Sequence, residues 1–130
     1  MDVVIDASAL LAVLLNEPER QTIIESTRGA SLVAPSSLDY EIGNALSALM
    51  RRRSITIAES VAVYHSFARI PVRLIEPDMQ AALLVSGEEN IYAYDAYFIA
   101  CAERLGLPLL TLDKRLADTA LKRGVRLMEA

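Results

Sequence analysis

Apolar and polar residues follow one another along the chain in two patterns, one typical of short buried strands and the other of helices. Runs of three or four apolar residues predict strands, and apolar residues that recur every three or four positions predict helices. Strands are expected over residues 3–5, 31–34, 72–75, 109–112 and 125–127. Helices are expected over residues 8–15, after Pro18, and over 36–52, 56–68, 78–86, 91–105 and 114–123. Strands that alternate with helices indicate an α/β fold, with a short parallel central sheet of four to five strands flanked by helices on both faces.

The helix expected over residues 91–105 carries a carboxylate on the face that should be buried. Its sequence is IYAYDAYFIACAERL, and Gly106 is placed to end it. On helical spacing, the face of Asp95 also carries the apolar residues Phe98, Ile99, Ala102 and Leu105. Burying an ionised carboxylate without a partner costs several kcal/mol or forces it to take up a proton. The sequence therefore predicts that something compensates for Asp95.

Other acids are expected at the same place. Asp6 directly follows the strand over residues 3–5, and Asp113 follows the strand over residues 109–112. The carboxyl ends of parallel strands meet at one edge of a sheet, where ligands of such folds bind. Glu41 borders the apolar stripe of the helix over residues 36–52, and Asn44 continues the same polar line about one turn later.

Each acid alone has a structural explanation, but the four together favour a metal site. Asp6 and Asp113 are suitable helix N-caps, an interaction that contributes about 1 kcal/mol. Four carboxylates at one edge would repel one another, and a divalent cation removes that conflict. Mg²⁺ and Mn²⁺ prefer carboxylate oxygens, whereas a single Cys and a single His cannot form a structural zinc site.

Composition narrows the class of protein further. The chain has 130 residues, of which 53% are hydrophobic and 23% charged, so we expect one globular domain over residues 1–130. The single Cys101 excludes an intramolecular disulfide and suits a reducing cytoplasm. No stretch has the length or the flanks of a membrane span or a signal peptide. The net charge of -4 argues against a general nucleic-acid coat protein. Basic clusters such as residues 51–53 are interpreted as solvated helix ends.

The acids and their neighbours resemble a known family. DAS at residues 6–8, the helix with Glu41 and Asn44, YDA at 94–96 and TLDKRL at 111–116 resemble the PIN-domain family, and more specifically its VapC-type ribonuclease toxins. The resemblance covers essentially the whole chain and implies a PIN-like fold. It also implies an endoribonuclease that depends on Mg²⁺ or Mn²⁺, forms a homodimer, cleaves RNA and is inhibited by a cognate antitoxin protein.

The same resemblance assigns roles to individual residues. Asp6, Glu41 and Asp95 match the family's acidic triad, and Asp113 matches its fourth acid; these four are the expected catalytic residues and metal ligands. Ser8 and Thr111 match polar positions that line the same site. The basic residues expected to hold RNA phosphates are Lys114 and Arg115, which directly follow a proposed ligand.

Three alternatives fit part of the pattern. A phosphoacceptor module similar to receiver domains also gathers acids, a Thr and a Lys at a sheet edge, but it needs a pair of acids after its first strand. A non-catalytic binding protein would keep the acids as structural groups and use Tyr92, Tyr94 and Tyr97 in a protein interface. A metal phosphodiesterase that acts on DNA would share all four acids, and only its substrate would distinguish it.

Overall fold

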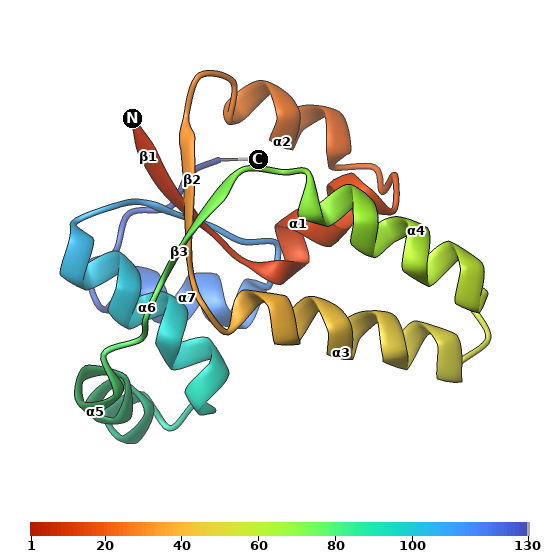
Figure 1. Ribbon diagram of the computed structural model, residues 1–130. Coiled ribbons are helices and arrows are strands. Elements are labelled where there is room, and N and C mark those ends of the chain that lie inside the picture. Colours follow the sequence, from red (N-terminus) through yellow and green to blue (C-terminus); the bar gives the residue numbers. More distant parts are fainter. Residues whose placement is uncertain (130) are drawn as a thin grey trace.

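Four short parallel strands form the centre of the protein. The computed structural model describes residues 1–129 (Figure 1), so Ala130, the end of the expected domain, lies outside the described residues. The strands are β1 (Asp2–Ile5), β2 (Ser31–Pro35), β3 (Val72–Ile75) and β4 (Leu109–Leu110), in the order β3-β2-β1-β4. All pair in parallel, for example Val4 with both Val33 of β2 and Leu109 of β4. The expected α/β fold with a parallel sheet is confirmed.

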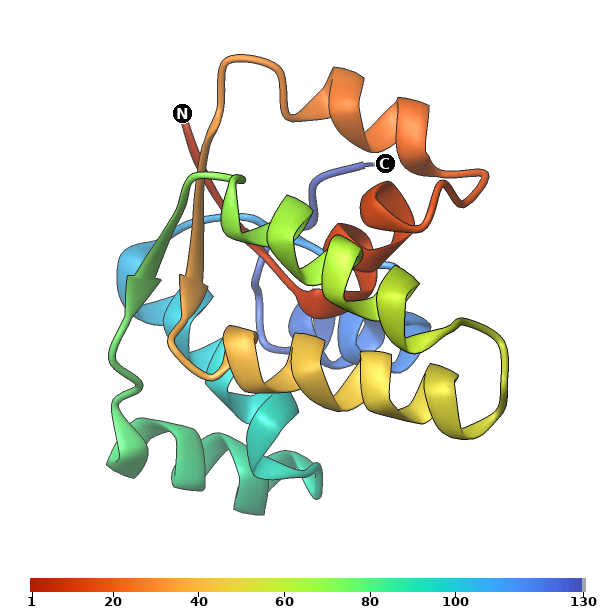
Figure 2. The same ribbon diagram turned by 45° about the vertical axis from the view of Figure 1, so that its right-hand side comes forward.

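Seven helices connect and cover the strands. They are α1 (Ala7–Leu14), α2 (Arg20–Ser26), α3 (Leu38–Arg51), α4 (Ile57–Ala68), α5 (Met79–Glu89), α6 (Ala93–Leu105) and α7 (Lys114–Lys122). Figures 1 and 2 show α1 to α4 gathered on one side of the sheet and α5 and α6 on the other. Helices cover both faces of the sheet, so side chains on both sides of β1 are buried, and Val3 and Val4 are fully buried. This explains why the buried part of β1 is apolar throughout.

The carboxyl edge of the sheet differs from expectation near β4. The strand predicted over residues 109–112 ends at Leu110, because the next backbone amides bond to side chains instead of a neighbouring strand. The amide of Leu112 donates to Ser8 Oγ at 2.9 Å, and the amide of Asp113 donates to Thr111 Oγ1 at 2.9 Å. The strand predicted over residues 125–127 is reduced to a single bridge between Leu109 and Leu127.

The helix boundaries follow local chemistry. The capping box predicted at the start of α4 is present, with reciprocal hydrogen bonds between Thr56 and Glu59. Asn90 adopts a left-handed conformation, with φ of 54°, and so separates α5 from α6. Helix α6 therefore begins two residues later than predicted, at Ala93, and Gly106 ends it as expected.

Helix α6 carries more buried residues than any other described helix, and it contacts β1, β2 and β4. Phe98, Ile99 and Ala102 are buried as predicted. Leu105 is 36% exposed, so its predicted place on the buried stripe is wrong. Leu105 is the last residue of α6, and residues 103–106 are all exposed, so this end of the helix lies at the surface.

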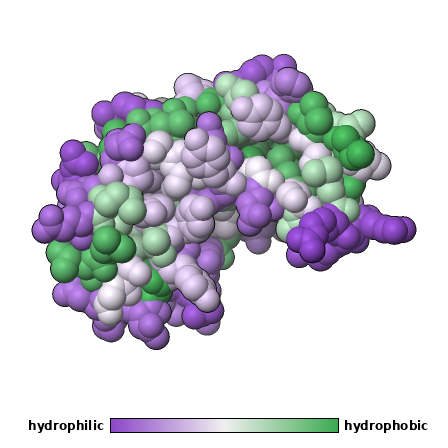
Figure 3. Space-filling view, turned by 60° about the horizontal axis from the view of Figure 1, so that its bottom comes forward, coloured by the Kyte–Doolittle hydropathy of each residue, from purple (hydrophilic) through white to green (hydrophobic). Residues whose placement is uncertain are grey.

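Helices α3 and α4 form a hairpin that extends away from the sheet (Figures 1 and 2), with residues 51–53 at its tip. The space-filling view shows the surface hollowed beside this projection, with apolar and polar patches alternating around it (Figure 3). Within residues 1–129, none of the helices combines the length and the apolar character needed to cross a bilayer.

Candidate active site

Asp6 is a buried carboxylate at the carboxyl end of β1. Its side chain caps α1 and is only 5% exposed. Oδ1 accepts hydrogen bonds from Ser8 Oγ at 2.7 Å and from the amide of Ala9 at 3.0 Å, and Oδ2 accepts one from Thr111 Oγ1. Burial raises the pKa of Asp6, the hydrogen bonds from Thr111, Ala9 and Ser8 lower it, and the charge of Asp113 raises it further. Asp6 is thus the N-cap that the sequence predicted, and burial and the charge of Asp113 disfavour its ionised form.

Ser8 and Thr111 join the two strand ends that carry Asp6 and Asp113. Both hydroxyls donate to Asp6, and both accept an amide from the turn that follows β4. The two hydroxyl oxygens lie 3.3 Å apart, so they form one hydrogen-bonded unit across the edge of the sheet. The polar lining predicted at these two positions is therefore present around Asp6.

Asp113 caps α7, as its position after β4 predicted. Its Oδ1 accepts hydrogen bonds from the amides of Arg115 at 3.0 Å and Leu116 at 3.2 Å. The residue is exposed to solvent. Its carboxylate is close enough to raise the pKa of both Asp6 and Asp95 through charge repulsion. The capping role and a place among the site acids are therefore compatible.

Glu41 and Asp95 extend from helices on opposite sides of the sheet toward the same region. Both are half-buried, and Ser37 Oγ donates to Glu41 Oε2 at 3.1 Å. Burial, together with the charges of Asp6 and Asp95, raises the pKa of Glu41 to about 7. Burial and the charge of Asp113 also raise the pKa of Asp95, whereas Arg115 lowers it. Each of the four predicted acids therefore acts electrostatically on at least one of the others.

Asn44 lies away from these interactions. It is one turn after Glu41 on α3, but its side chain is exposed and makes no side-chain hydrogen bond within residues 1–129. Its supporting role stays a prediction.

The four acids fit a hard divalent cation by charge and donor type. No Lys or Arg forms an ion pair with any of them within residues 1–129, so their negative charge lacks a paired counter-ion. In that part of the chain, however, no three acidic, His or Cys side chains are drawn together closely enough to hold one ion. The chemistry of the donor set suits Mg²⁺ or Mn²⁺, and the carboxylates would have to move closer together to bind it.

An open cleft of about 660 Å³ runs beside two of these acids. Asp95 and Asp113 line one part of it, and the connection between α5 and α6 and the exposed face of α7 line the rest. Of the two basic residues expected to hold RNA, Arg115 lines this cleft, whereas Lys114 is exposed nearby without lining it. Tyr92 also lines the cleft. From the sequence it was predicted only in a protein interface, under the alternative of a non-catalytic binding protein, because its position relative to α7 depends on tertiary structure.

Replacing Thr111 tests whether the hydroxyl network positions Asp6. Thr111→Val keeps the shape of the side chain but removes the donor to Asp6 and the acceptor for the amide of Asp113. We expect the rate of the RNA cleavage that the family resemblance implies to fall about 10- to 100-fold, as for groups that orient metal ligands, and the free energy of unfolding to fall by about 1–2 kcal/mol. Thr111→Ser should restore most of the activity, and Thr22→Val, at an exposed site on α2, is the control. Full activity in Thr111→Val would show that Asp6 needs no such support.

Glu41 should make the metal-free protein less stable as the pH rises. Its pKa is about 7 in the folded protein and 4.5 without burial, so folding binds a proton between these pH values. The contribution of Glu41 to the free energy of unfolding is therefore highest below about pH 4.5 and declines until the pH passes 7. Glu41→Gln should therefore raise the free energy of unfolding by about 1–2 kcal/mol at pH 8, a value reduced for partial solvent exposure.

The measurement is urea unfolding in EDTA at pH 4.5 and pH 8, with Glu25→Gln on the exposed face of α2 as the control. The gain from Glu41→Gln should nearly vanish at pH 4.5. An equal gain at both pH values would contradict an electrostatic origin.

With this geometry in place, comparisons with known proteins identify the class to which the fold and site belong. The sequence matches the PIN domain over residues 3–122, and the chain therefore belongs to the PIN domain family. Ribonuclease VapC12 of Mycobacterium tuberculosis is 32% identical over 119 residues, which cover 90% of this chain and 91% of that protein. The likeness places the chain in the VapC branch of the family.

Two solved structures share the fold. PAE2754 from Pyrobaculum aerophilum matches with a TM-score of 0.70 and 24% identity, covering 92% of this chain and 79% of the other. A structure of VapBC2 from Rickettsia felis, bound to a DNA fragment from its promoter, matches with a TM-score of 0.68 and 13% identity, covering 98% and 97%. At these identities they support the fold.

Proposed function

We propose that this chain is a metal-dependent endoribonuclease and the toxin of a type II toxin–antitoxin pair, acting as one nuclease domain in the cytoplasm. The observation that carries the proposal is the set of four mutually repelling acids at the carboxyl edge of a PIN-domain sheet. A relative of 32% identity that is named a ribonuclease supports RNA as the substrate.

Asp6, Asp95 and Asp113 would hold Mg²⁺ or Mn²⁺, with Glu41 as the fourth acid of the set. Such an ion supplies positive charge that stabilises the transition state of phosphodiester hydrolysis. Ser8 and Thr111 keep Asp6 oriented toward the site, and Asp113 is fixed by the amides that it caps. Glu41 accepts a hydrogen bond from Ser37 at Oε2, and its other oxygen would help to orient the attacking water.

The proposed reaction predicts the ends of the cut RNA. The proposed nucleophile is water, and not the ribose 2′-hydroxyl, and the bond from phosphorus to the 3′-oxygen breaks, so the cut RNA should carry 5′-phosphate and 3′-hydroxyl ends. Lys114 and Arg115 lie beside Asp113 and would hold the phosphates that flank the cut. The RNA should be single-stranded at the cut, because a protein can read its bases only where they are unstacked.

A toxin needs further partners, and we include a homodimer and a cognate antitoxin protein in the proposal. The structure of VapBC2, which resembles this chain in fold, supports the antitoxin. Exposed apolar residues on α4, namely Ile57, Val61 and Tyr64, offer a contact surface for a protein.

The test is cleavage of total cellular RNA by the purified protein in Mg²⁺, in Mn²⁺ and in EDTA, with single-stranded DNA as a parallel substrate. We expect cuts in RNA that require the metal and carry the predicted ends. Ends with 2′,3′-cyclic phosphate would contradict the proposed nucleophile, and cutting of DNA alone would favour the DNA phosphodiesterase. Absence of cutting, with no change of melting temperature on adding metal, would return the acids to a structural role.

The receiver-like alternative has little support from the fold. It needs paired acids after β1 and an acid at the end of a central strand, whereas Asp6 stands alone and both Glu41 and Asp95 lie on helices.

A further inference from the structure

The cleft beside Asp95 and Asp113 is larger than a site for the scissile phosphate alone requires. Its volume of about 660 Å³ extends from the two acids along α7 to the connection between α5 and α6. Beyond these two acids it is lined by an aromatic ring, a guanidinium group, two uncharged polar side chains and two further carboxylates. The residues that provide them are Glu89, Asn90, Tyr92, Arg115, Asp118 and Thr119.

Tyr92 occupies a position that local stability would give to another residue. It is the N-cap of α6, where Ser, Thr, Asp or Asn would accept a hydrogen bond from the helix, yet its side chain makes no such bond. Its ring is also 87% exposed, more than any other large apolar or aromatic residue that the structure describes. A position that disregards both capping and burial is expected where a residue serves binding.

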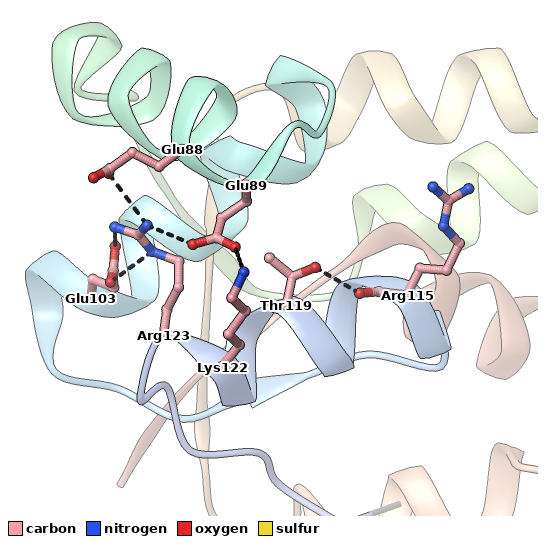
Figure 4. A network of polar contacts seen from close by, with 7 residues as sticks. All are labelled: Glu88, Glu89, Glu103, Arg115, Thr119, Lys122 and Arg123. Atoms are coloured by element: carbon pink, nitrogen blue, oxygen red, sulfur yellow. Dashed lines mark hydrogen bonds and ion pairs between the residues drawn. The ribbon is translucent and has the colours of Figure 1, made fainter.

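Arg115 is available to bind an anion. It forms no ion pair within residues 1–129, and its charge lowers the pKa of Asp95, so the guanidinium lies near the acids. Figure 4 shows its side chain directed away from the neighbouring group of ion pairs, while its carbonyl accepts a hydrogen bond from Thr119 at 3.0 Å.

The ion pairs themselves hold the two walls of the cleft together. Arg123, at the end of α7, contacts Glu88 and Glu89 on α5 and Glu103 on α6 at 3.1–3.4 Å (Figure 4). Lys122 Nζ lies 2.9 Å from Glu89. The segment with Asn90 and Tyr92, which follows Glu89, is thereby fixed relative to α7 before any ligand arrives. Of the two further acids in the cleft, Glu89 is neutralised by these ion pairs, whereas Asp118 forms none within residues 1–129.

We propose that this cleft binds an unstacked base of single-stranded RNA next to the scissile phosphate. Tyr92 stacks on the base, Arg115 contacts the adjacent phosphate, and Asn90 and Asp118 offer hydrogen-bonding groups to the base edge. The inference rests on the proposed ribonuclease function and extends it to the residues that hold the base beside the cut. A base paired in a duplex cannot reach Tyr92, so the cleft selects single strands.

The experiment compares wild type, Tyr92→Asn and Tyr92→Phe in binding a fluorescein-labelled, mixed-sequence RNA of twelve nucleotides, by fluorescence anisotropy in EDTA at low salt. Tyr92→Asn should weaken binding about 5- to 100-fold, the range for loss of one base–aromatic stack, and Tyr92→Phe should stay within about twofold. A duplex of the same RNA should respond less than about twofold to Tyr92→Asn, because its bases remain stacked. Tyr40→Asn, at a ring on α3 that is 76% exposed and does not line the cleft, is the matched control.

Two further measurements, the melting temperature and the cleavage of RNA, distinguish this inference from its alternatives. Asn is a favourable N-cap, so Tyr92→Asn should melt at or above the temperature of the wild type, which excludes unfolding as the cause of weaker binding. Binding by Tyr92→Asn within twofold of the wild type, or no measurable binding by the wild type, would overturn the base site. Tyr92-dependent binding without cleavage in Mg²⁺ or Mn²⁺ would instead overturn the nuclease and leave the base site standing.

Discussion

Asp95→Asn is expected to reduce RNA cleavage by at least about 100-fold, the loss typical of removing a charged group from a preorganised site. The substitution keeps the size and shape of the side chain and removes only its negative charge. Asp95 is half-buried, and the charge of Asp113 raises its pKa, so in the metal-free protein the ionised form is under strain. The same change should therefore leave the melting temperature in EDTA unchanged or raise it.

Asp95→Asn should therefore lower the cleavage rate without lowering the melting temperature, and both quantities can be measured. Cleavage would be followed on a defined RNA in Mg²⁺, and melting by circular dichroism in EDTA and in Mg²⁺. Wild type should gain stability from added Mg²⁺, by RT ln(1 + [L]/Kd), and Asp95→Asn should gain less. Asp39→Asn, at a half-buried acid on α3 outside the site, is the matched control. A clear drop in the melting temperature of Asp95→Asn would identify a structural carboxylate with a buried partner.

Phe98→Ala should lower the free energy of unfolding by about 3–5 kcal/mol, which is a large part of the stability of a small domain. Phe98 is 1% exposed and heads the largest fully buried side chains of the described core. It lies three residues after Asp95 on α6, the helix that packs on three of the four strands. Truncation would leave a cavity beneath this helix, and the surrounding backbone can only partly close it.

Urea unfolding at pH 7 would measure this loss. Phe98→Leu, which refills most of the volume, should recover more than half of it. Tyr94→Ala removes an aromatic ring from the exposed side of the same helix, where Tyr94 is 55% exposed, and should cost less than about 1 kcal/mol. Equal losses in Phe98→Ala and Tyr94→Ala would mean that α6 does not anchor the core.

Much of this fold could be predicted from local patterns. The buried strands, the capping box of α4 and the end of α6 at Gly106 each depend on residues close together in the sequence. The predictions failed where side chains distant in sequence decide the backbone. Strand β4 ends early because Ser8, about a hundred residues earlier, accepts the amide of Leu112, and no local pattern contains that interaction.

The grouping of the four acids could also be predicted from the sequence. Asp6 and Asp113 follow parallel strands, so topology alone brings them to one edge, and their helices direct Glu41 and Asp95 inward. The cleft and its lining by Tyr92 and Arg115 were not predictable in the same way. They depend on the packing of the α5–α6 connection against α7, which the ion pairs of Arg123 hold in place.

The pairing of β1 with β4 has a consequence for the chain during its synthesis. β1 leaves the ribosome first, yet its neighbour β4 and the hydroxyl of Thr111 that bonds to Asp6 are more than a hundred residues behind it. A nascent chain has only one of the two strand ends that form the site until residues up to Asp113 have emerged. The site that we propose for RNA cleavage therefore cannot be complete until nearly the whole chain has been made.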